Sequence, residues 1–318
     1  MKISKIILSF VFAGALAGPA GACDLCAVYA AGAARGEAGS GFFAGVAEQF
    51  THFGTVQIDG QKAPNPTGQF MNSTISQLFA GYNFNERVGV QFNAPVIYRS
   101  FKRPEGFAID RGTESGLGDV SLIGTFTPVR WEKMNHTFAW RLIGGVKLPT
   151  GDSRRIGEEL TEVEIPGAPE SGIHGHDLTL GSGSVDGIVG TGIFARQKRM
   201  FFTANGQYSI RSQGDFNYRF ANDMTWSGGP GVYVLLDDDY TLSLQAVISG
   251  EHKRLDSFQG APADDTGVTA VYFGPQLSVT WKEHLSAEIA VDFPLSINNT
   301  SLQTVPDYRV RGGLTWHF

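Results

Sequence analysis

The last eleven residues of the chain, 308–318, limit the possible fold more than any other stretch. They alternate between two faces, one polar and basic and one apolar with aromatic residues at both ends. The apolar set is Tyr308, Val310, Gly312, Leu314, Trp316 and Phe318. Successive side chains of a β-strand point to opposite sides, so this pattern requires a different solvent on each side. A tilted strand of about 9–11 residues with aromatics at both interfaces is typical of a transmembrane β-barrel.

Runs of the same kind recur from about residue 40 onward. We identify twelve: 41–53, 70–83, 87–98, 116–130, 137–149, 184–196, 200–212, 223–236, 240–250, 268–281, 285–296 and 307–318. In the first, sixth and eighth of these runs, apolar and polar residues do not separate cleanly onto two faces. Connections of a few residues alternate strictly with long ones, and the longest is 150–183. Short turns at one end and long loops at the other are typical of up-and-down barrels of the bacterial outer membrane.

The predicted fold is therefore all-β: a single up-and-down antiparallel transmembrane β-barrel of about twelve strands over residues 41–318. No stretch after the N-terminus approaches the 18 or more apolar residues of a membrane helix. A secreted β-sandwich or propeller is the alternative fold, and it would bury the apolar faces against one another. The net charge of −6 argues against nucleic acid as a partner, because nucleic-acid binding depends on basic patches.

Residues 1–22 have the features of a secretory signal peptide. Lys2 and Lys5 form the charged start, an apolar core follows, and small residues at 20–22 suit a cleavage site. We expect the mature protein to be exported to the outer membrane of a bacterium. Disulfides can persist in the compartment that it passes through.

Two cysteines, Cys23 and Cys26, fall in a periplasmic N-terminal segment, 23–40, that precedes the predicted barrel. The spacing fits a local disulfide or a pair of free thiols. Acylation of Cys23 would instead tether the chain to the membrane. A metal or redox site built on the CDLC sequence is the third reading, although no His follows as in a haem attachment site.

Charged residues within the predicted strands should face the lumen, because a charge at mid-bilayer costs about 2–4 kcal/mol. This gives a lumen-lining set of mixed sign: Asp119, Arg141, Lys147, Arg211, Glu288, Asp292, Arg309 and Arg311. One interpretation is a structural network in which each charge satisfies a neighbour. The other is a constriction that orients a small polar solute and sets selectivity. Both can hold in one barrel.

The longest predicted loop contains a close histidine pair, His174 and His176, followed by Asp177. Imidazoles suit zinc, copper or nickel, so the pair is a candidate metal site, and a solvated loop tip is the alternative. An enzyme would need a nucleophile, a His base and an orienting group. The motif of barrel phospholipases is not recognisable, and no G-x-S-x-G elbow is present, so we expect neither catalysis nor a cofactor.

Three segments together resemble a known family: ESGLGDVSLIGTF (114–126), KLPTGD (147–152) and GSGSVDGIVGTGIF (181–194). They are similar to the meta-pathway-of-phenol-degradation family of proposed outer-membrane transporters. The aromatic last residue, Phe318, also resembles the C-terminal assembly signature of bacterial outer-membrane barrels. The resemblance implies an outer-membrane barrel that admits hydrophobic or aromatic compounds. The CDLC start is not part of the family's pattern.

The sequence thus predicts a monomeric outer-membrane channel for the passive passage of small molecules. Its expected partners are outer-membrane lipids and a small-molecule solute. The alternative function is a plugged structural or partner-binding barrel. In that case the CxxC segment would dock a periplasmic partner or a metal.

Overall fold

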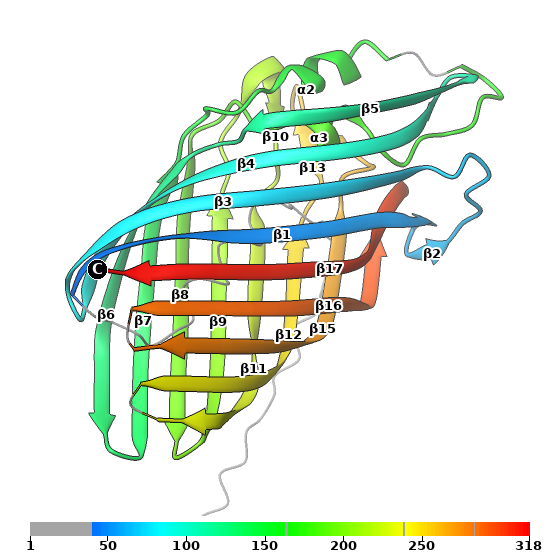
Figure 1. The fold of residues 1–318 in the computed structure, drawn as a ribbon. Helices are drawn as coiled ribbons and strands as arrows, with labels where there is room; N and C mark the ends of the chain where they lie inside the picture. Colours follow the sequence, from blue (N-terminus) through cyan, green and yellow to red (C-terminus); the bar gives the residue numbers. More distant parts are fainter. Residues whose placement is uncertain (1–39, 163–164, 238, 283) are drawn as a thin grey trace, which may run out of the picture.

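The computed structural model describes residues 40–162, 165–237, 239–282 and 284–318. Within these ranges twelve long strands lie side by side, each antiparallel to the next, and the last pairs with the first (Figure 1). The sheet is therefore closed, so backbone groups of its first and last strands are paired as well. The predicted antiparallel barrel is confirmed. The predicted signal peptide and the two cysteines of the CDLC sequence lie outside the described residues.

The barrel wall is built from strands close to the predicted runs. In chain order these are β1 (Gly41–Ile58), β3 (Phe70–Asn85), β4 (Val88–Glu105), β6 (Ser121–Lys133), β7 (His136–Lys147), β8 (Asp186–Gln197), β9 (Met200–Ile210), β11 (Asp223–Leu236), β12 (Tyr240–Lys253), β15 (Val268–Trp281), β16 (Leu285–Asn299) and β17 (Leu302–His317). The largest difference is at 99–115, which we expected to be a connection. There β4 continues and forms a hairpin with β5 (Ala108–Leu117). This hairpin has polar residues on both faces, so it lacks the apolar–polar alternation by which the other strands were identified.

The remaining elements are short and all belong to the long connections. They are β2 (Gln61–Lys62), α2 (Arg154–Glu159), α3 (Gly175–Leu178), the 3₁₀ helix η1 (Asp215–Asn217), β10 (Tyr218–Arg219), β13 (Asp256–Phe258) and β14 (Ala261–Ala263). Strands β10, β13 and β14 form a small separate sheet. Figure 1 shows α2, α3, β10 and β13 at one end of the barrel, with the C-terminus at the other end. Among the described residues, no helix is both long and apolar enough to cross a membrane.

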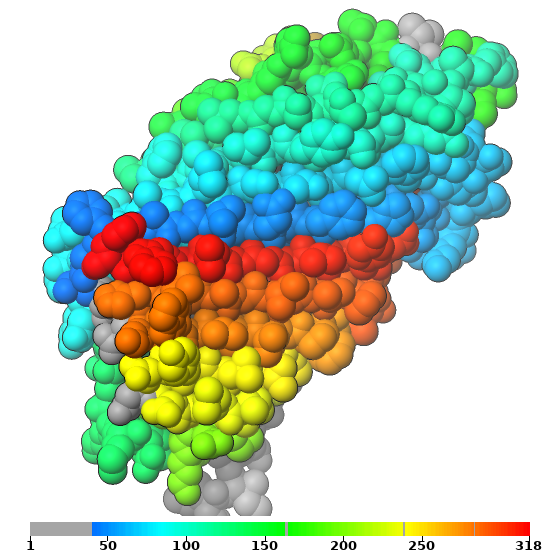
Figure 2. All heavy atoms as spheres, viewed as in Figure 1, coloured from blue at the N-terminus to red at the C-terminus, as the bar shows by residue number. Residues whose placement is uncertain are grey.

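The outer face of the barrel is apolar, as the alternation predicts. On β16, Phe293 is 55% exposed, whereas Ser286 and Asp292 on the opposite face are 2% and 1% exposed. On β17, Trp316 is 42% exposed. Figure 2 shows β1 (blue) packed against β17 (red) in a continuous outer wall. Large apolar side chains around a closed wall are stable only against lipid, so the protein is a barrel of the bacterial outer membrane.

Part of the inner face is also apolar, which explains why the first run does not sort into two faces. On β1 the buried inward positions include Ala47 and Phe53 as well as Gln49 and Thr51. Apolar residues therefore occur on both sides of this strand. The inward ones need a cover other than water, and a loop from elsewhere in the chain provides it.

Candidate functional site: the barrel interior and its outer mouth

The connection between β7 and β8, residues 148–185, folds against the inside of the wall; we call it the mouth loop. Two clusters of buried apolar side chains join it to the inner faces of β1, β3 and β4. The first contains Leu180 with Ala47, Ile75 and Ile97, and the second contains Ile173 and Leu178 with Phe53, Met71 and Phe101. Burial of apolar area is the main favourable term in packing, so the mouth loop is held as part of the fold.

Two arginines on β4 bind the backbone of the mouth loop. Arg99 donates to the carbonyl of Thr179, and Arg103 donates to the carbonyl of Ile173 at 3.4 Å. Arg103 also forms an ion pair with Glu162 at 2.7 Å. Hydrogen bonds from charged donors are stronger than neutral ones, so they fix the loop in addition to its apolar contacts.

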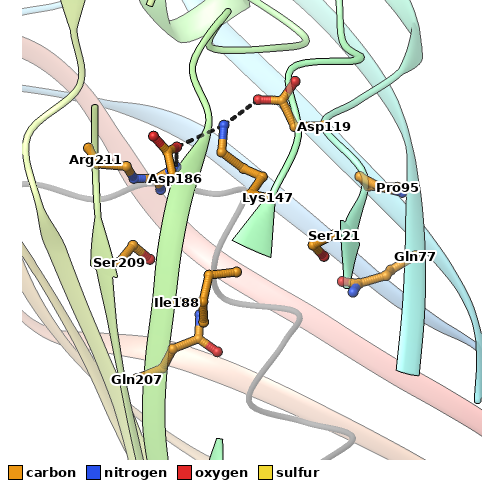
Figure 3. A pocket seen from close by; sticks show the side chains of 10 residues that line it. All are labelled: Gln77, Pro95, Asp119, Ser121, Lys147, Asp186, Ile188, Gln207, Ser209 and Arg211. Atoms are coloured by element: carbon orange, nitrogen blue, oxygen red, sulfur yellow. Dashed lines mark hydrogen bonds and ion pairs between the residues drawn. The ribbon is translucent and has the colours of Figure 1, made fainter. Parts of the chain in front are cut away.

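The two ends of the mouth loop meet at Asp119, in the segment between β5 and β6. Its carboxylate accepts hydrogen bonds from the backbone N–H groups of Gly151 and Ser182, each at 3.0 Å. Lys147 Nζ lies 2.5 Å from the same carboxylate and also contacts the Ser182 hydroxyl. Figure 3 shows this lysine between two carboxylates. Two of the predicted lumen-lining residues, Asp119 and Lys147, therefore anchor the loop.

From Lys147 a chain of buried ion pairs continues to the first residue of β8, the residue after β9 and the first residue of β11. Lys147 Nζ lies 2.8 Å from Asp186, Asp186 lies 2.9 Å from Arg211, and Arg211 lies 2.7 Å from Asp223. Each of these side chains is less than 10% exposed. Charges buried to this extent are stable when they are paired. Sequence reasoning missed Asp186 and Asp223, although Asp223 begins a predicted run and Asp186 is the third residue of another.

The other predicted lumen-lining residues are distributed around the wall. Arg309 contacts Glu251 and lies over the ring of Tyr272, 3.8 Å from its centroid. Arg311 binds both oxygens of Asp292, at 2.6 and 2.9 Å. Glu288 accepts a hydrogen bond from Gln276 at 3.2 Å, and Arg141 is half-buried on β7. The charges thus fall into separate groups, most of them containing both signs, and the partner Glu251 was not predicted.

A small cavity lies beside the first of these groups. Figure 3 shows the side chains that line it: Gln77, Pro95, Asp119, Ser121, Lys147, Asp186, Ile188, Gln207, Ser209 and Arg211. The lining offers hydrogen-bond donors and acceptors, but most of its exposed surface is apolar. It could therefore contact a small solute that has both polar and apolar parts.

The predicted histidine pair lies at the outer mouth, where His174 precedes α3 and His176 lies within it. The two rings stack with centroids 5.7 Å apart. His176 is buried, with Nδ1 2.8 Å from Glu159 of α2 and Nε2 3.5 Å from Asp177. His174 Nε2 lies 3.4 Å from Asp265. The structure therefore brings together the pair and two carboxylates that sequence spacing did not connect.

In this cluster, the electrostatic environment favours the charged forms of both His176 and Glu159. Burial alone would lower the pKa of His176, but the carboxylates of Asp177 and Glu159 outweigh it and raise that pKa to about 10. Burial would likewise raise the pKa of Glu159, but the His176 ring outweighs it and lowers that pKa to about 2. The two groups therefore form an imidazolium–carboxylate pair at neutral pH.

Comparison with known proteins supports the fold. A scan of protein-family models and a search of curated proteins gave no match. Among solved structures, the barrel is similar to an outer membrane channel from Pseudomonas putida F1, with 13% identity and a TM-score of 0.59, covering 88% of this chain and 96% of that one. At this identity the similarity establishes the fold and does not transfer function.

Weaker likenesses are to autotransporter barrels. The beta domain of Bordetella BrkA has 9% identity and a TM-score of 0.45, covering 88% of this chain and 100% of that one. The translocator domain of NalP from Neisseria meningitidis has 11% identity and a TM-score of 0.41, covering 88% and 89%. Membership of the phenol-degradation family has no matching family model and stays a prediction.

Proposed function

We propose that this protein is an outer-membrane channel for the passive passage of small molecules. The observation that carries the proposal is the small cavity inside a closed wall, next to ion pairs that also hold the mouth loop. A solute that crosses the barrel would pass between this loop and the charged side of the wall. The loop would then set the width of the path, and the charged groups would set its preference among solutes.

The lining of the cavity favours a small solute that carries both polar and apolar groups. Lys147 and Arg211 offer cationic donors, Gln77 and Gln207 offer amides, and Ile188 adds apolar surface. The phenol-degradation resemblance suggests hydrophobic or aromatic compounds, and an aromatic ring with a polar substituent would satisfy both expectations. We propose that the channel acts as a monomer, with no catalytic step and no cofactor.

A plugged barrel is the second candidate, and the packing of the mouth loop favours it. Ile173, Leu178 and Leu180 are each at most 6% exposed, so the loop is fixed against the wall. A barrel sealed in this way would serve as a structural or partner-binding protein. The segment with Cys23 and Cys26 would then dock a periplasmic partner or a metal.

Conductance distinguishes the two functions. The full mature chain, refolded into a planar bilayer, should give discrete ion-conducting steps if it is a channel. A variant in which residues 155–178 are replaced by a short Gly-Ser linker should conduct more, because the loop narrows the path. Silence of the native chain together with conduction by the shortened variant would support the plug. Silence of both, with correct folding shown by heat-modifiable migration on gels, would reject the channel.

A further inference from the structure

A second site, separate from the cavity, lies where two outer loops meet at the mouth. Glu159 and His176 belong to the mouth loop, and Asp265 belongs to the connection between β14 and β15. One potential ligand atom from each residue lies within 4.8 Å of those of the other two. The three residues are separated by up to 106 positions in sequence, 265 − 159, so the fold brings them together.

We propose that Glu159, His176 and Asp265 bind a divalent transition-metal ion of the zinc class. Bonds of about 2.0–2.2 Å to nitrogen and oxygen in a tetrahedral site place the ligand atoms roughly 3.3–3.6 Å apart. The observed separations, from 2.8 Å between His176 and Glu159 to within 4.8 Å across the group, bracket this range. A fourth position is left for His174, whose Nε2 lies 3.4 Å from Asp265.

The groups around His176 suit a ligand role for its ring. Nδ1 faces Glu159 and would be the ligand atom, its proton being released to solvent when the metal binds, while Nε2 faces Asp177 at 3.5 Å. A carboxylate at the second ring nitrogen is the usual partner of a metal-bound histidine, because it fixes the tautomer and the ring orientation. The rings of His174 and Tyr218 stack near His176, at 5.7 and 6.3 Å between centroids, and limit its rotation.

Close packing of α2 against α3 places Glu159 beside His176. A side chain on Gly175 would bring its Cβ within 2.1 Å of the Arg155 carbonyl oxygen and 2.7 Å of the Glu159 Cβ. Only a glycine allows this approach of the two helices. Glu159 also accepts a hydrogen bond from the backbone N–H of His176 at 2.7 Å. The first two ligands are therefore positioned by backbone geometry before any ion arrives.

The loop that carries Asp265 is held by another buried carboxylate, Asp256. Asp256 accepts from the Tyr218 hydroxyl at 2.8 Å, from the Ala221 backbone at 2.7 Å and from Lys253 at 2.7 Å. Its own backbone N–H donates to Thr266, the residue after Asp265, at 2.8 Å. The third ligand is thus also placed by the fold.

The ligand chemistry identifies the class of ion. One imidazole and two carboxylates suit zinc, and also nickel or copper, whereas calcium and magnesium prefer sites made entirely of oxygen. Glu159, Asp177 and Asp265 also give the cluster more carboxylates than His176 can balance alone, which favours a cation. A bound ion would join the mouth loop to the neighbouring loop and hold the mouth in one conformation.

Metal binding can be measured on the purified, refolded mature chain, whatever its conductance. Isothermal titration with zinc, after removal of metal by a chelator, should give one ion per chain. Calcium or magnesium in large excess should not compete. Glu159→Gln, His176→Ala and Asp265→Asn should each weaken binding at least tenfold. Gly175→Ala should also weaken it, although it removes no ligand atom.

His136→Ala, at the opposite end of the barrel, is the matched control and should bind as the native chain does. Heat-modifiable migration on gels shows whether each variant is folded. Absence of stoichiometric zinc binding would overturn the proposal. So would folded Glu159→Gln and Asp265→Asn variants that bind zinc with native affinity. In that case the cluster would be only a network of ion pairs.

Discussion

Glu48 occupies a position where a charge is costly. Its neighbours on β1, Ala47 and Gln49, are 7% and 1% exposed and face inward, so Glu48 faces the lipid. It pairs with Gly312 of β17, which lies midway between the two aromatic ends of that strand. The carboxylate is therefore near the middle of the membrane, where the small Gly312 leaves space beside it.

We predict that Glu48→Leu stabilises the barrel by about 1–2 kcal/mol, since acidic residues at mid-depth cost less than the 2–4 kcal/mol of basic ones. Urea unfolding in liposomes should show a higher midpoint for this variant. Glu86→Gln, at an exposed turn, should leave the midpoint unchanged. A lower midpoint for Glu48→Leu would mean that the carboxylate has a stabilising partner.

Lys147 is the residue whose loss should most destabilise the interior. It neutralises Asp119 and Asp186, and its replacement by Met would leave two buried carboxylates without their shared cation. Removal of one partner from a buried pair costs about 3–5 kcal/mol. We expect the free energy of unfolding in urea to fall by about that amount.

The double variant Lys147→Met with Asp119→Asn should recover part of this loss, because one of the two carboxylates is then neutral. Lys62→Met, on the exposed strand β2, is the matched control and should have no effect. If Lys147→Met unfolds at the same urea concentration as the native chain, water solvates the two carboxylates.

For the mouth loop, the sequence predicted the position along the chain but not the packing inside the barrel. Its length and position between the fifth and sixth runs follow from the alternation of short and long connections. Its contacts do not, because Leu180 packs against Ile97 and Ala47, more than 80 residues earlier in the chain. A buried apolar residue in a loop looks the same in sequence whether it packs inside the barrel or outside it.

Leu180→Asn should release this loop from the wall while leaving the barrel closed. The substitution puts an amide into an apolar cluster, and such a change costs about 2–5 kcal/mol. We expect faster cleavage by added protease in proteoliposomes and larger current fluctuations. Leu160→Asn, in the same loop but 36% exposed, should behave like the native chain. Equal protease resistance of the two variants would show that Leu180 does not hold the loop.

At the scale of the whole barrel, the period-two alternation predicts the wall well, because the lipid outside enforces it on most of the strands. It also identifies Arg309 and Arg311 as inward residues. It cannot assign their partners, since Glu251 and Asp292 come from strands whose alignment depends on register. Strand order was predictable from connection lengths, whereas ion pairs depend on the stagger that closes the barrel.

Because Arg309 and Arg311 are paired with carboxylates, changing the charge of the lumen tests whether ions pass beside them. Replacing Arg309 and Arg311 with Ser leaves Glu251 and Asp292 in place, so the lumen becomes more negative by two charges. If these residues line the conducting path, the reversal potential in a salt gradient should shift toward cation selectivity by a severalfold change in permeability ratio. Adding Glu251→Gln and Asp292→Asn should restore the native value, because the balance of charge returns. A reversal potential that stays constant through both steps would show that ions pass elsewhere, and that these pairs serve only to stabilise the wall.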